Sequence, residues 1–376
     1  MDVVVAGAGI GGLALANGLV AAGHRVRVLE RAPGPRADGA AVTIFSNGAA
    51  AAAGLGVPLD GLGGRVETLE FTDRAGAVLA ATDLRVLHRR TGFPVATIPR
   101  AAILERFAAG LPDGTIAYGR GLVDVTVDQG VRVTDAAGET HTPDVLVGAD
   151  GYRSEVRRRV LGDGPARAVG WTSWQGLTKA LPEIAESTRA RCLVGPAGLC
   201  GLMPAGDGLL QWWFDVPEEP DGPVVQWLRT RFAGYAEPVR ELLAGVTEAD
   251  VGRYPHVVHE VPDRWGVGGA TLVGDAAHAF PPSQAQGANQ ALEDAWLLAR
   301  ALGTGAGDPA DLLRRYEIRR ARRVRRVAKL AASEVTNRPP TGARRVLGRL
   351  LSPRLAGHAY VSVIRSWSSV LNDERI

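Results

Sequence analysis

The spacing of hydrophobic positions changes along the chain and divides it into three parts. The first thirty residues contain an apolar run, "DVVVAG", a glycine-rich stretch, a second apolar segment and "HRVRVLE". This order predicts strand, turn, helix and strand. Residues 66–98 alternate with a period of two, which indicates half-buried strands. Residues 167–262 are rich in tryptophan, glycine and proline, with strands such as "LLQWWFDV" and one helix near 224–233.

Helical periodicity dominates the rest of the chain. We expect a helix directly after Pro99, another near Ser154, and a strand, turn and long helix over residues 270–303. Residues 311–335 are helical by pattern, and the Pro-Pro pair at 339–340 ends that run before a short helical tail. Because helices and strands alternate at both ends around a strand-rich block, the sequence predicts an α/β fold with a second sheet.

The length and composition of the chain favour some classes of protein over others. A chain of 376 residues favours two connected domains. The net charge of +3 is too small to indicate a nucleic-acid partner. The cysteines, Cys192 and Cys200, have no metal-ligand spacing and fit a reducing cytoplasm. The apolar N-terminus lacks a basic leader and holds six glycines before residue 24, so we expect neither export nor membrane insertion.

The first motif with chemical meaning is "GAGIGG", which follows a strand and opens a helix. Gly7 permits the tight turn, Gly9 lets a pyrophosphate approach the backbone, and Gly12 allows close packing of helix on strand. The second strand ends at Glu30, where a carboxylate can accept hydrogen bonds from ribose hydroxyls. The pattern predicts a dinucleotide site.

Two further strand ends carry a carboxylate. In "VGADGYRSEVR" a buried strand ends near Asp150 and Ser154 can cap the helix that follows. In "LVGDAAHAFPPSQAQGANQ" Asp275 can accept hydrogen bonds from a polyol, and the helix that begins near residues 287–289 can direct its N–H groups at an electron-rich ring. We interpret His278, inside that turn, as structural.

Together these three stretches resemble the FAD-dependent monooxygenases of the para-hydroxybenzoate-hydroxylase-like class, from Asp2 to about Ala332. "IPRAAILERF" and "YGRGLVDV" match further segments of that family. The resemblance implies non-covalent FAD and an α/β fold with a Rossmann-like domain, an interleaved β-sheet substrate domain and C-terminal helices. The cofactor-binding residues that it implies are Gly7, Gly9, Gly12, Glu30, Arg31, Arg100, Leu122, Asp150, Asp275, Pro281, Gly287, Ala288 and Asn289.

The resemblance also implies a discontinuous organisation. Residues 1–69, 99–166 and 263–335 would form the FAD-binding domain, 70–98 and 167–262 the substrate domain, and 336–376 a helical tail. The implied reaction uses NAD(P)H and O2, through a flavin C4a-hydroperoxide, to hydroxylate or epoxidise an aromatic or polycyclic molecule in secondary metabolism or aromatic catabolism. The cofactor performs the difficult chemistry, so we assign no catalytic side chain and no metal.

Three positions depart from the family pattern. Ala285 replaces the first glycine of the family's Pro-x-x-Gly-Gln-Gly segment, Gln175 stands where an arginine is usual, and Gln211 stands where the urate-hydroxylating branch has tyrosine. The last difference disfavours urate as the substrate. Candidate pocket residues are Trp174, Gln175, Gln211 and Trp213. Alternation in "LLQWWFDV" places Gln211 and Trp213 on one face of a strand, and we expect either that face or the opposite one to meet the flavin.

Alternatives remain open at this point. An NAD-dependent dehydrogenase would share the first thirty residues but has no use for the Asp275 segment. A flavin halogenase would need a Trp-x-Trp-x-Ile-Pro segment, and "WTSW" has the wrong spacing. An oxidase or dehydrogenase without oxygen insertion and a non-catalytic flavin-binding relic are also compatible. Residues 314–329 carry nine basic side chains and one acid, which favours a solvated or bridging helix face over attraction of NAD(P)H phosphates. Both monomer and homodimer are compatible.

Overall fold

The computed structural model describes residues 1–35, 40–303 and 307–373. A parallel sheet in the order β18-β12-β1-β2-β8 carries the glycine-rich turn. Its strands are β1 (Asp2–Ala6), β2 (Arg25–Glu30), β8 (Ile116–Tyr118), β12 (Val145–Gly148) and β18 (Ala270–Leu272). The valines of β1 are buried, as expected for a strand in a parallel sheet that is covered on both faces.

Helices cover this sheet. Helix α1 (Ile10–Ala21) follows β1 and packs against α10 (Gly287–Gly303), which in turn packs on α2 (Ser46–Gly54) and α11 (Pro309–Ala332). Helix α4 (Arg100–Ala109) packs on α1, and the short helices α5 (Glu155–Leu161) and α9 (Asp275–His278) follow β12 and β18. The predicted order of strand, turn, helix and strand at the N-terminus is therefore confirmed.

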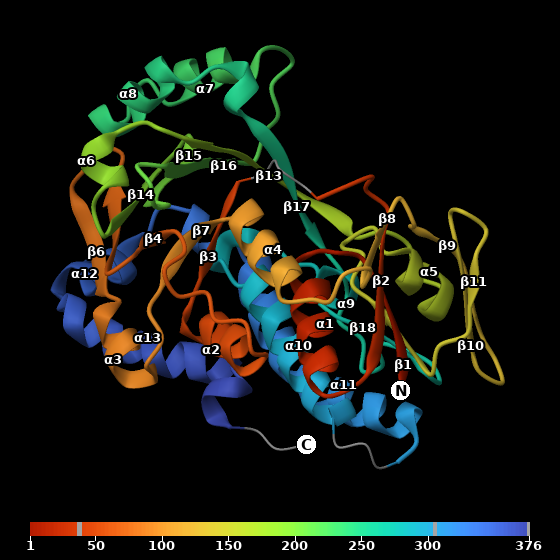
Figure 1. The fold of residues 1–376 in the computed structure, drawn as a ribbon. Helices are drawn as coiled ribbons and strands as arrows, with labels where there is room; N and C mark the ends of the chain where they lie inside the picture. Colours follow the sequence, from red (N-terminus) through yellow and green to blue (C-terminus); the bar gives the residue numbers. More distant parts are fainter. Residues whose placement is uncertain (36–39, 304–306, 374–376) are drawn as a thin grey trace.

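A second, seven-stranded sheet lies above the first domain in the view of Figure 1. Its order is β17-β13-β16-β15-β14-β5-β6, and its pairs are antiparallel except for β14 with β5. Helices cover its outer face (Figure 1). The elements are β5 (Thr68–Asp73), β6 (Val78–Asp83), β13 (Arg167–Thr178), β14 (Arg189–Gly195), β15 (Gly198–Pro204), β16 (Leu210–Val216), β17 (Gly252–Val258), α6 (Pro182–Ala185), α7 (Val224–Arg231) and α8 (Glu237–Gly245).

Two small sheets and the C-terminal helices complete the fold. One sheet joins β3 (Ala41–Ile44), β7 (Ala96–Pro99) and β4 (Gly64–Arg65), and the other joins β9 (Leu122–Val127), β10 (Val131–Asp135) and β11 (Thr140–His141). Helices α12 (Gly342–Leu350) and α13 (Pro353–Trp367) pack on β6, and α13 also packs on α3 (Arg85–Thr91). The short 3₁₀ segments are η1 (Glu248–Asp250), η2 (Pro282–Gln284), η3 (Val335–Asn337) and η4 (Val370–Asn372).

The predicted fold class, a Rossmann-like α/β domain with an interleaved β-sheet and C-terminal helices, is confirmed. The alternation assigned to residues 66–98 was wrong over residues 85–91, which form α3. There the Asp83 carboxylate accepts a hydrogen bond from the Arg85 N–H, and Gly92 ends the helix in the left-handed conformation. The sequence also did not reveal α8. The exact domain boundaries stay a prediction. No described helix is long and apolar enough to cross a membrane.

A buried histidine ties the second sheet to the segment after α11. His256 Nδ1 lies 2.7 Å from Glu334 Oε1, and its Nε2 lies 3.4 Å from Asp215 Oδ1. Burial alone would lower the pKa of His256, but the two carboxylates outweigh this effect and raise the pKa to about 9. The histidine is therefore held in its charged form at neutral pH.

This tie predicts a pH-dependent stability. A histidine pKa raised from about 6.5 to about 9 stabilises the fold fully below the lower value and loses that effect as pH rises through the higher one. Replacement His256→Gln should therefore cost on the order of 3 kcal/mol of unfolding free energy at pH 6 and much less at pH 9.5. Urea unfolding at both pH values measures the difference, with the exposed His358→Gln as control. A His256→Gln effect that is the same at both pH values would contradict the assignment.

Candidate active site

The glycine-rich turn has the geometry that its sequence predicted. Gly7 adopts a φ of +104°, and a Cβ there would lie 2.5 Å from the Ala149 carbonyl oxygen. A Cβ on Gly12 would collide with the Gly7 carbonyl oxygen, whereas a Cβ on Gly9 would meet nothing within 4 Å. Packing therefore requires glycine at positions 7 and 12, and Gly9 faces open space at the N-terminus of α1. Such a position can receive a phosphate.

Glu30 fastens this turn to the end of β2. Its Oε2 accepts a hydrogen bond from the Ala8 N–H (2.7 Å) and its Oε1 accepts one from the Ala32 N–H (2.8 Å). Arg31 is exposed, and Gly121 packs against it so closely that a Cβ on Gly121 would lie 2.7 Å from the Arg31 Cβ. Leu122 follows directly. The predicted residues at this edge of the sheet therefore lie together, and Glu30 has a structural task that its pattern did not reveal.

Asp150 also has a structural task. Its carboxylate accepts hydrogen bonds from Ser154 Oγ (2.5 Å) and from the N–H groups of Glu155 (2.7 Å) and Val156 (3.2 Å). Ser154 Oγ in turn accepts a hydrogen bond from the Arg157 N–H, so the predicted N-cap is confirmed. The Asp150 side chain therefore holds the start of α5, and a contact between Asp150 and a cofactor stays a prediction.

Asp275 is placed differently from the other two carboxylates. Its side chain is exposed, although the next three residues are buried. Protein nevertheless surrounds it on enough sides that burial raises its pKa, and attraction from His278 and Arg100 offsets part of the rise. Among the described residues, none donates a hydrogen bond to this carboxylate. The Arg100 Nε, at the start of α4, is buried and likewise lacks a partner within the described residues.

His278 lies in a fully buried network beside this turn. Its Nε2 is 2.6 Å from Asp294 Oδ2, and Asp294 also accepts hydrogen bonds from Arg320 Nε (2.6 Å) and the Gly274 N–H (2.8 Å). This environment agrees with the structural role expected for His278. Arg320 belongs to the basic segment of residues 314–329. Its buried guanidinium bonds to Asp294 of α10, so this part of the helix is a bridging face, which is one of the two forms of the interpretation favoured from the sequence.

The segment after Pro281 is held by Asn289. Pro281 is buried, and Gly287, Ala288 and Asn289 open α10. The Asn289 Oδ1 accepts a hydrogen bond from the Phe45 N–H (2.8 Å), while its Nδ2 donates to the carbonyl oxygens of Thr43 (3.0 Å) and Ala285 (2.8 Å). The Asn289 side chain is thus occupied by protein contacts. Helix geometry leaves the N–H groups of the first turn available for a ligand.

Ala285 occupies a conformation that favours glycine. Its φ of 49° and ψ of 33° lie in the left-handed region, at the end of η2. An L-residue with a Cβ costs about 1–2 kcal/mol there. The departure noted in the sequence therefore places strain in the loop that precedes α10.

The inner face of the seven-stranded sheet carries three of the four predicted pocket residues. Gln211 Oε1 accepts a hydrogen bond from the Ala41 N–H (2.5 Å), and its Nε2 donates to Gln175 Oε1 (3.3 Å). Trp213 is half-buried and lies opposite Gln175 in the register. The two glutamines at which the sequence departs from the family pattern are therefore hydrogen-bonded neighbours. The sheet face that carries Gln211 and Trp213 is the one directed at β3.

The prediction for Trp174 was wrong. Neighbouring residues of a strand point to opposite faces, so Trp174 cannot share the face of Gln175. It pairs with Phe214 and lies in the core between the sheet and its outer helices.

Sequence reasoning missed two side chains on the inner face. The Tyr254 hydroxyl lies 3.4 Å from the Ala40 nitrogen, and Met203 Sδ accepts hydrogen bonds from the hydroxyls of Thr43 (3.2 Å) and Thr97 (3.4 Å). Tyr254 pairs with Ser173 and Met203 with Gln211 across neighbouring strands. Only the strand pairing brings them to this face, and no local pattern signals it.

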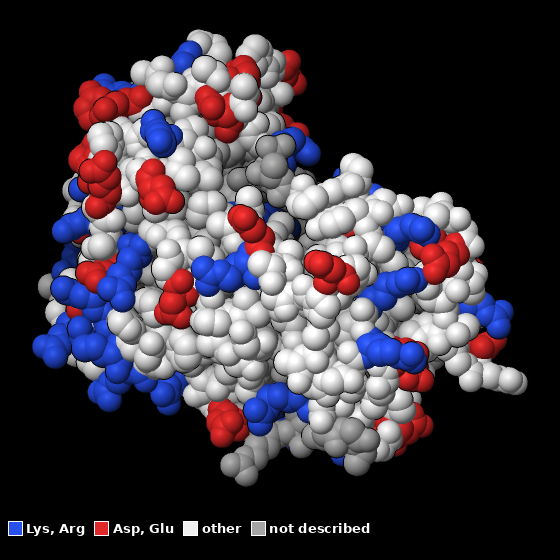
Figure 2. Space-filling model, viewed as in Figure 1, with Lys and Arg blue, Asp and Glu red and all other residues white. Residues whose placement is uncertain are grey.

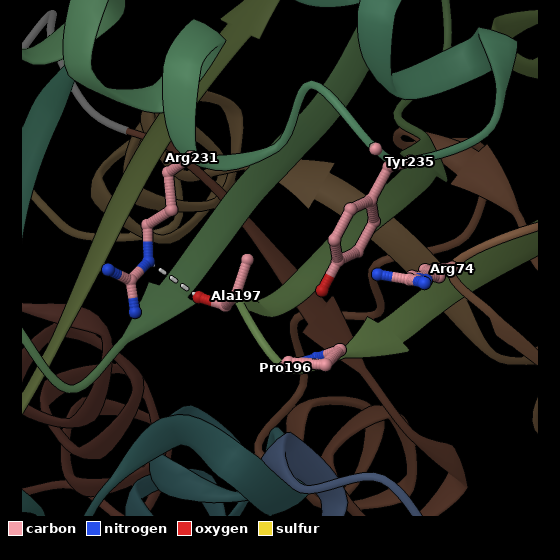
Figure 3. A pocket seen from close by; sticks show the side chains of 6 residues that line it. Arg74, Pro196, Ala197, Arg231 and Tyr235 are labelled. Carbon is pink, nitrogen blue, oxygen red and sulfur yellow. Dashed lines mark hydrogen bonds between the residues drawn. The ribbon is translucent and has the colours of Figure 1, made fainter.

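A pocket of about 360 Å³ lies elsewhere, where the turn between β14 and β15 meets the end of β5 and the end of α7. Figure 3 shows Arg74, Arg231 and Tyr235 around the turn at Pro196 and Ala197. Arg231 Nε donates to the Ala197 carbonyl oxygen (2.7 Å), so this part of its guanidinium is already engaged. None of the predicted site residues lines this pocket.

Comparison with known proteins shows to which family this chain belongs. The profile of the FAD binding domain matches residues 123–331, more than half of the chain. Aurachin C monooxygenase/isomerase from Stigmatella aurantiaca is 32% identical over 331 residues, which cover 85% of each chain. The 3-amino-4-hydroxybenzoate 2-monooxygenase PtmB3 from Streptomyces platensis is 34% identical over 342 residues, covering 86% of this chain and 85% of the relative. The chain belongs to the FAD-dependent aromatic monooxygenase family.

A solved structure of the family has the same architecture. Klebsiella pneumoniae HpxO complexed with FAD and uric acid superposes with a TM-score of 0.82 at 29% sequence identity, covering 99% of this chain and 95% of that chain. The resemblance drawn from the motifs is confirmed, and FAD is the cofactor. Family membership also excludes the NAD-dependent dehydrogenase.

The residues of this FAD-dependent monooxygenase fit the cofactor. Gly9 leaves open space at a helix N-terminus, where a pyrophosphate can bind. Asp275 offers a carboxylate without a hydrogen-bond donor among the described residues, as a ribityl hydroxyl requires. The buried, unpaired Nε of Arg100 offers a donor, and buried donors in folded proteins are normally satisfied.

Asp275→Ala should weaken FAD binding about 5- to 150-fold, because it removes a hydrogen-bond acceptor worth about 1–3 kcal/mol. Asp275→Asn should recover part of the loss, since its amide oxygen still accepts. His278→Ala should leave FAD affinity nearly unchanged while it lowers stability, because His278 contacts Asp294 instead of the ligand. Titration of the apo-protein with FAD measures all three. The assignment fails if Asp275→Ala binds as tightly as wild type and His278→Ala does not.

Ala285→Gly should leave the unfolding free energy unchanged or raise it by up to about 1 kcal/mol. Relief of the left-handed strain opposes the greater freedom of glycine in the unfolded chain. The matched control is Ala359→Gly at an exposed position inside α13, which should lose about 1 kcal/mol. Urea unfolding measures both variants. An equal loss at the two positions would show that Ala285 is not strained.

Proposed function

We propose that this FAD-dependent monooxygenase uses NAD(P)H and O2 to insert one oxygen atom into a neutral aromatic or polycyclic molecule. The turn at Gly7, Gly9 and Gly12, together with Glu30, Arg31 and Leu122, would hold the ADP half of FAD. Arg100, Asp275 and the start of α10 would hold the ribityl chain and ring. Bound FAD supplies the oxygen-transfer chemistry, and the protein positions the substrate and excludes water.

The observation that carries the substrate class is the pair of Gln175 and Gln211 on the inner sheet face. The Gln175 Nε2 donates one hydrogen bond, to Ser173 Oγ (3.0 Å), and its Oε1 accepts one, from Gln211 Nε2 (3.3 Å). A primary amide has two N–H groups and two carbonyl lone pairs. Gln175 therefore retains one donor and one acceptor side by side, which match a ring edge with an adjacent carbonyl and N–H or hydroxyl.

The charge of this face supports a neutral substrate. The side chains that we place beside Gln175 and Gln211 are those of Ser173, Met203, Trp213 and Tyr254, and none of them is cationic. The charged His256 farther along this face is buried and already engaged by the carboxylates of Asp215 and Glu334. A substrate carboxylate would lose its hydration here without gaining a counter-charge, which is costly. Half-buried Trp213 offers a flat apolar surface for a planar ring. Urate, which is an anion at neutral pH, stays disfavoured for the same reason.

The function is tested with the FAD-loaded protein in two steps, flavin reduction under anaerobic conditions and then turnover in the presence of ¹⁸O2. Compounds with a neutral lactam-like or hydroxy-carbonyl ring edge should accelerate flavin reduction by NADH or NADPH more than their carboxylate analogues do. With ¹⁸O2 the product should contain one labelled oxygen atom. Reduction with peroxide release and no labelled product from any compound would indicate an oxidase. Failure of the flavin to be reduced by either nucleotide would indicate a binding relic.

Gln175→Leu should raise KM for an active compound by roughly 5- to 10-fold for each lost hydrogen bond of about 1 kcal/mol, while FAD affinity stays unchanged. Gln175→Arg should shift the preference toward carboxylate analogues. The control is Gln226→Leu, the same chemical change at an exposed position of α7 on the outer side of the sheet. If Gln175→Leu and Gln226→Leu have the same KM, Gln175 does not contact the substrate.

A further inference from the structure

Helix α12 exposes an apolar face that no described part of the chain covers. The exposed fractions are 58% for Val346, 65% for Leu347 and 78% for Leu350. Leu351 and Leu355, at 39% and 60%, extend this face to the start of α13. Single exposed apolar side chains are common on protein surfaces, but a group of four leucines and one valine within ten residues is not.

The packing of α12 directs these side chains outward. Gly348 rests against β6, where a Cβ would lie 2.8 Å from the Leu79 carbonyl oxygen. At 100° per residue, Val346, Leu347 and Leu350 cluster on one side of a helix and residue 348 lies roughly opposite. Glycine therefore lets the polar backbone approach the sheet, while the larger apolar side chains face away from the protein.

Basic side chains surround this face. From residue 338 to residue 372 the sequence contains six arginines and no acidic residue. Figure 2 shows Lys and Arg gathered at the lower left of the view, over α12, α13 and α3, which packs on α13. Among the described side chains, the exposed arginines of these three helices are Arg85, Arg89, Arg90, Arg345, Arg349, Arg354 and Arg365.

Two aspartates offset part of this charge. Asp83 pairs with Arg85 and Arg89, and Asp73 lies 3.8 Å from Arg345. Seven described arginines against two aspartates leave a local excess of five positive charges.

We propose that α12 and the start of α13 dock on an anionic lipid surface. A short helix with an outward apolar face and flanking cations is the form that lies in a membrane interface without crossing the bilayer. Clusters of Lys or Arg next to such a helix attract anionic headgroups. A second copy of this chain is disfavoured as the occupant, because a symmetric contact would bring the same excess of positive charge together. The proposal does not depend on the substrate class.

Vesicle co-sedimentation of the full FAD-loaded chain tests the proposal. Vesicles that contain phosphatidylglycerol should pellet the protein at low salt, pure phosphatidylcholine vesicles should not, and high salt should weaken the binding. Leu347→Ser/Leu350→Ser and Arg349→Gln/Arg354→Gln should each reduce the bound fraction at least tenfold at limiting lipid. The control is Ile318→Ser/Arg240→Gln, which removes an equally exposed apolar side chain and an exposed arginine elsewhere. The flavin spectrum should be the same for all proteins.

Three results would overturn the proposal. The first is no binding to anionic vesicles at low salt, and the second is equal loss of binding in the control variant. The third is a wild-type dimer in solution that Leu347→Ser/Leu350→Ser converts to a monomer, because a second copy would then cover this face. Each of these readouts is independent of catalysis, so none depends on the proposed reaction.

Discussion

The buried carboxylate of Asp294 connects the three segments on which the flavin site depends. It receives the Gly274 N–H at the end of β18, the His278 imidazole of α9 and the Arg320 guanidinium of α11. Burial alone would raise the pKa of Asp294, but His278 and Arg320 outweigh this effect and lower it. Breaking a buried ion pair on one side leaves an uncompensated charge, which is strongly destabilising. Asp294 therefore holds the turn that presents Asp275 through the Gly274 N–H and the Arg320 guanidinium, two hydrogen bonds that do not involve His278.

The parts of the fold and of the candidate site that could be predicted from the sequence are those that a short sequence motif identifies. Gly12 is required by a contact with Gly7, five residues earlier, and Gly7 by its left-handed backbone and by Ala149 after the neighbouring strand β12. The spacing of these glycines alone was sufficient to predict the turn. Ser154 was recognisable as an N-cap because capping depends on the adjacent backbone. By contrast, Glu30 and Asp150 were predicted as ligands of a cofactor, and the structure shows that both also hold backbone N–H groups. A sequence pattern cannot separate these two uses of a carboxylate.

The parts that could not be predicted depend on pairing between distant strands. Gln175 and Gln211 lie 36 residues apart, and their hydrogen bond exists because β13 and β16 are neighbours in register. Trp174 was assigned to the pocket although its neighbour Gln175 was assigned there too, which strand alternation forbids. Ala285 is an intermediate case. Its sequence marked a departure from the family, but only the backbone shows that the position lies in the left-handed region.

The residues that fit FAD come from three widely separated places in the chain. The glycine-rich turn lies near residue 9, Arg100 opens α4, and Asp275 follows β18. A ligand that touches all three acts as a reversible cross-link that closes long loops of the polypeptide. A molecule that binds the folded chain and not the unfolded one raises the population of the folded chain by mass action. The supply of FAD in the cell therefore helps to set how much of this protein escapes proteolysis.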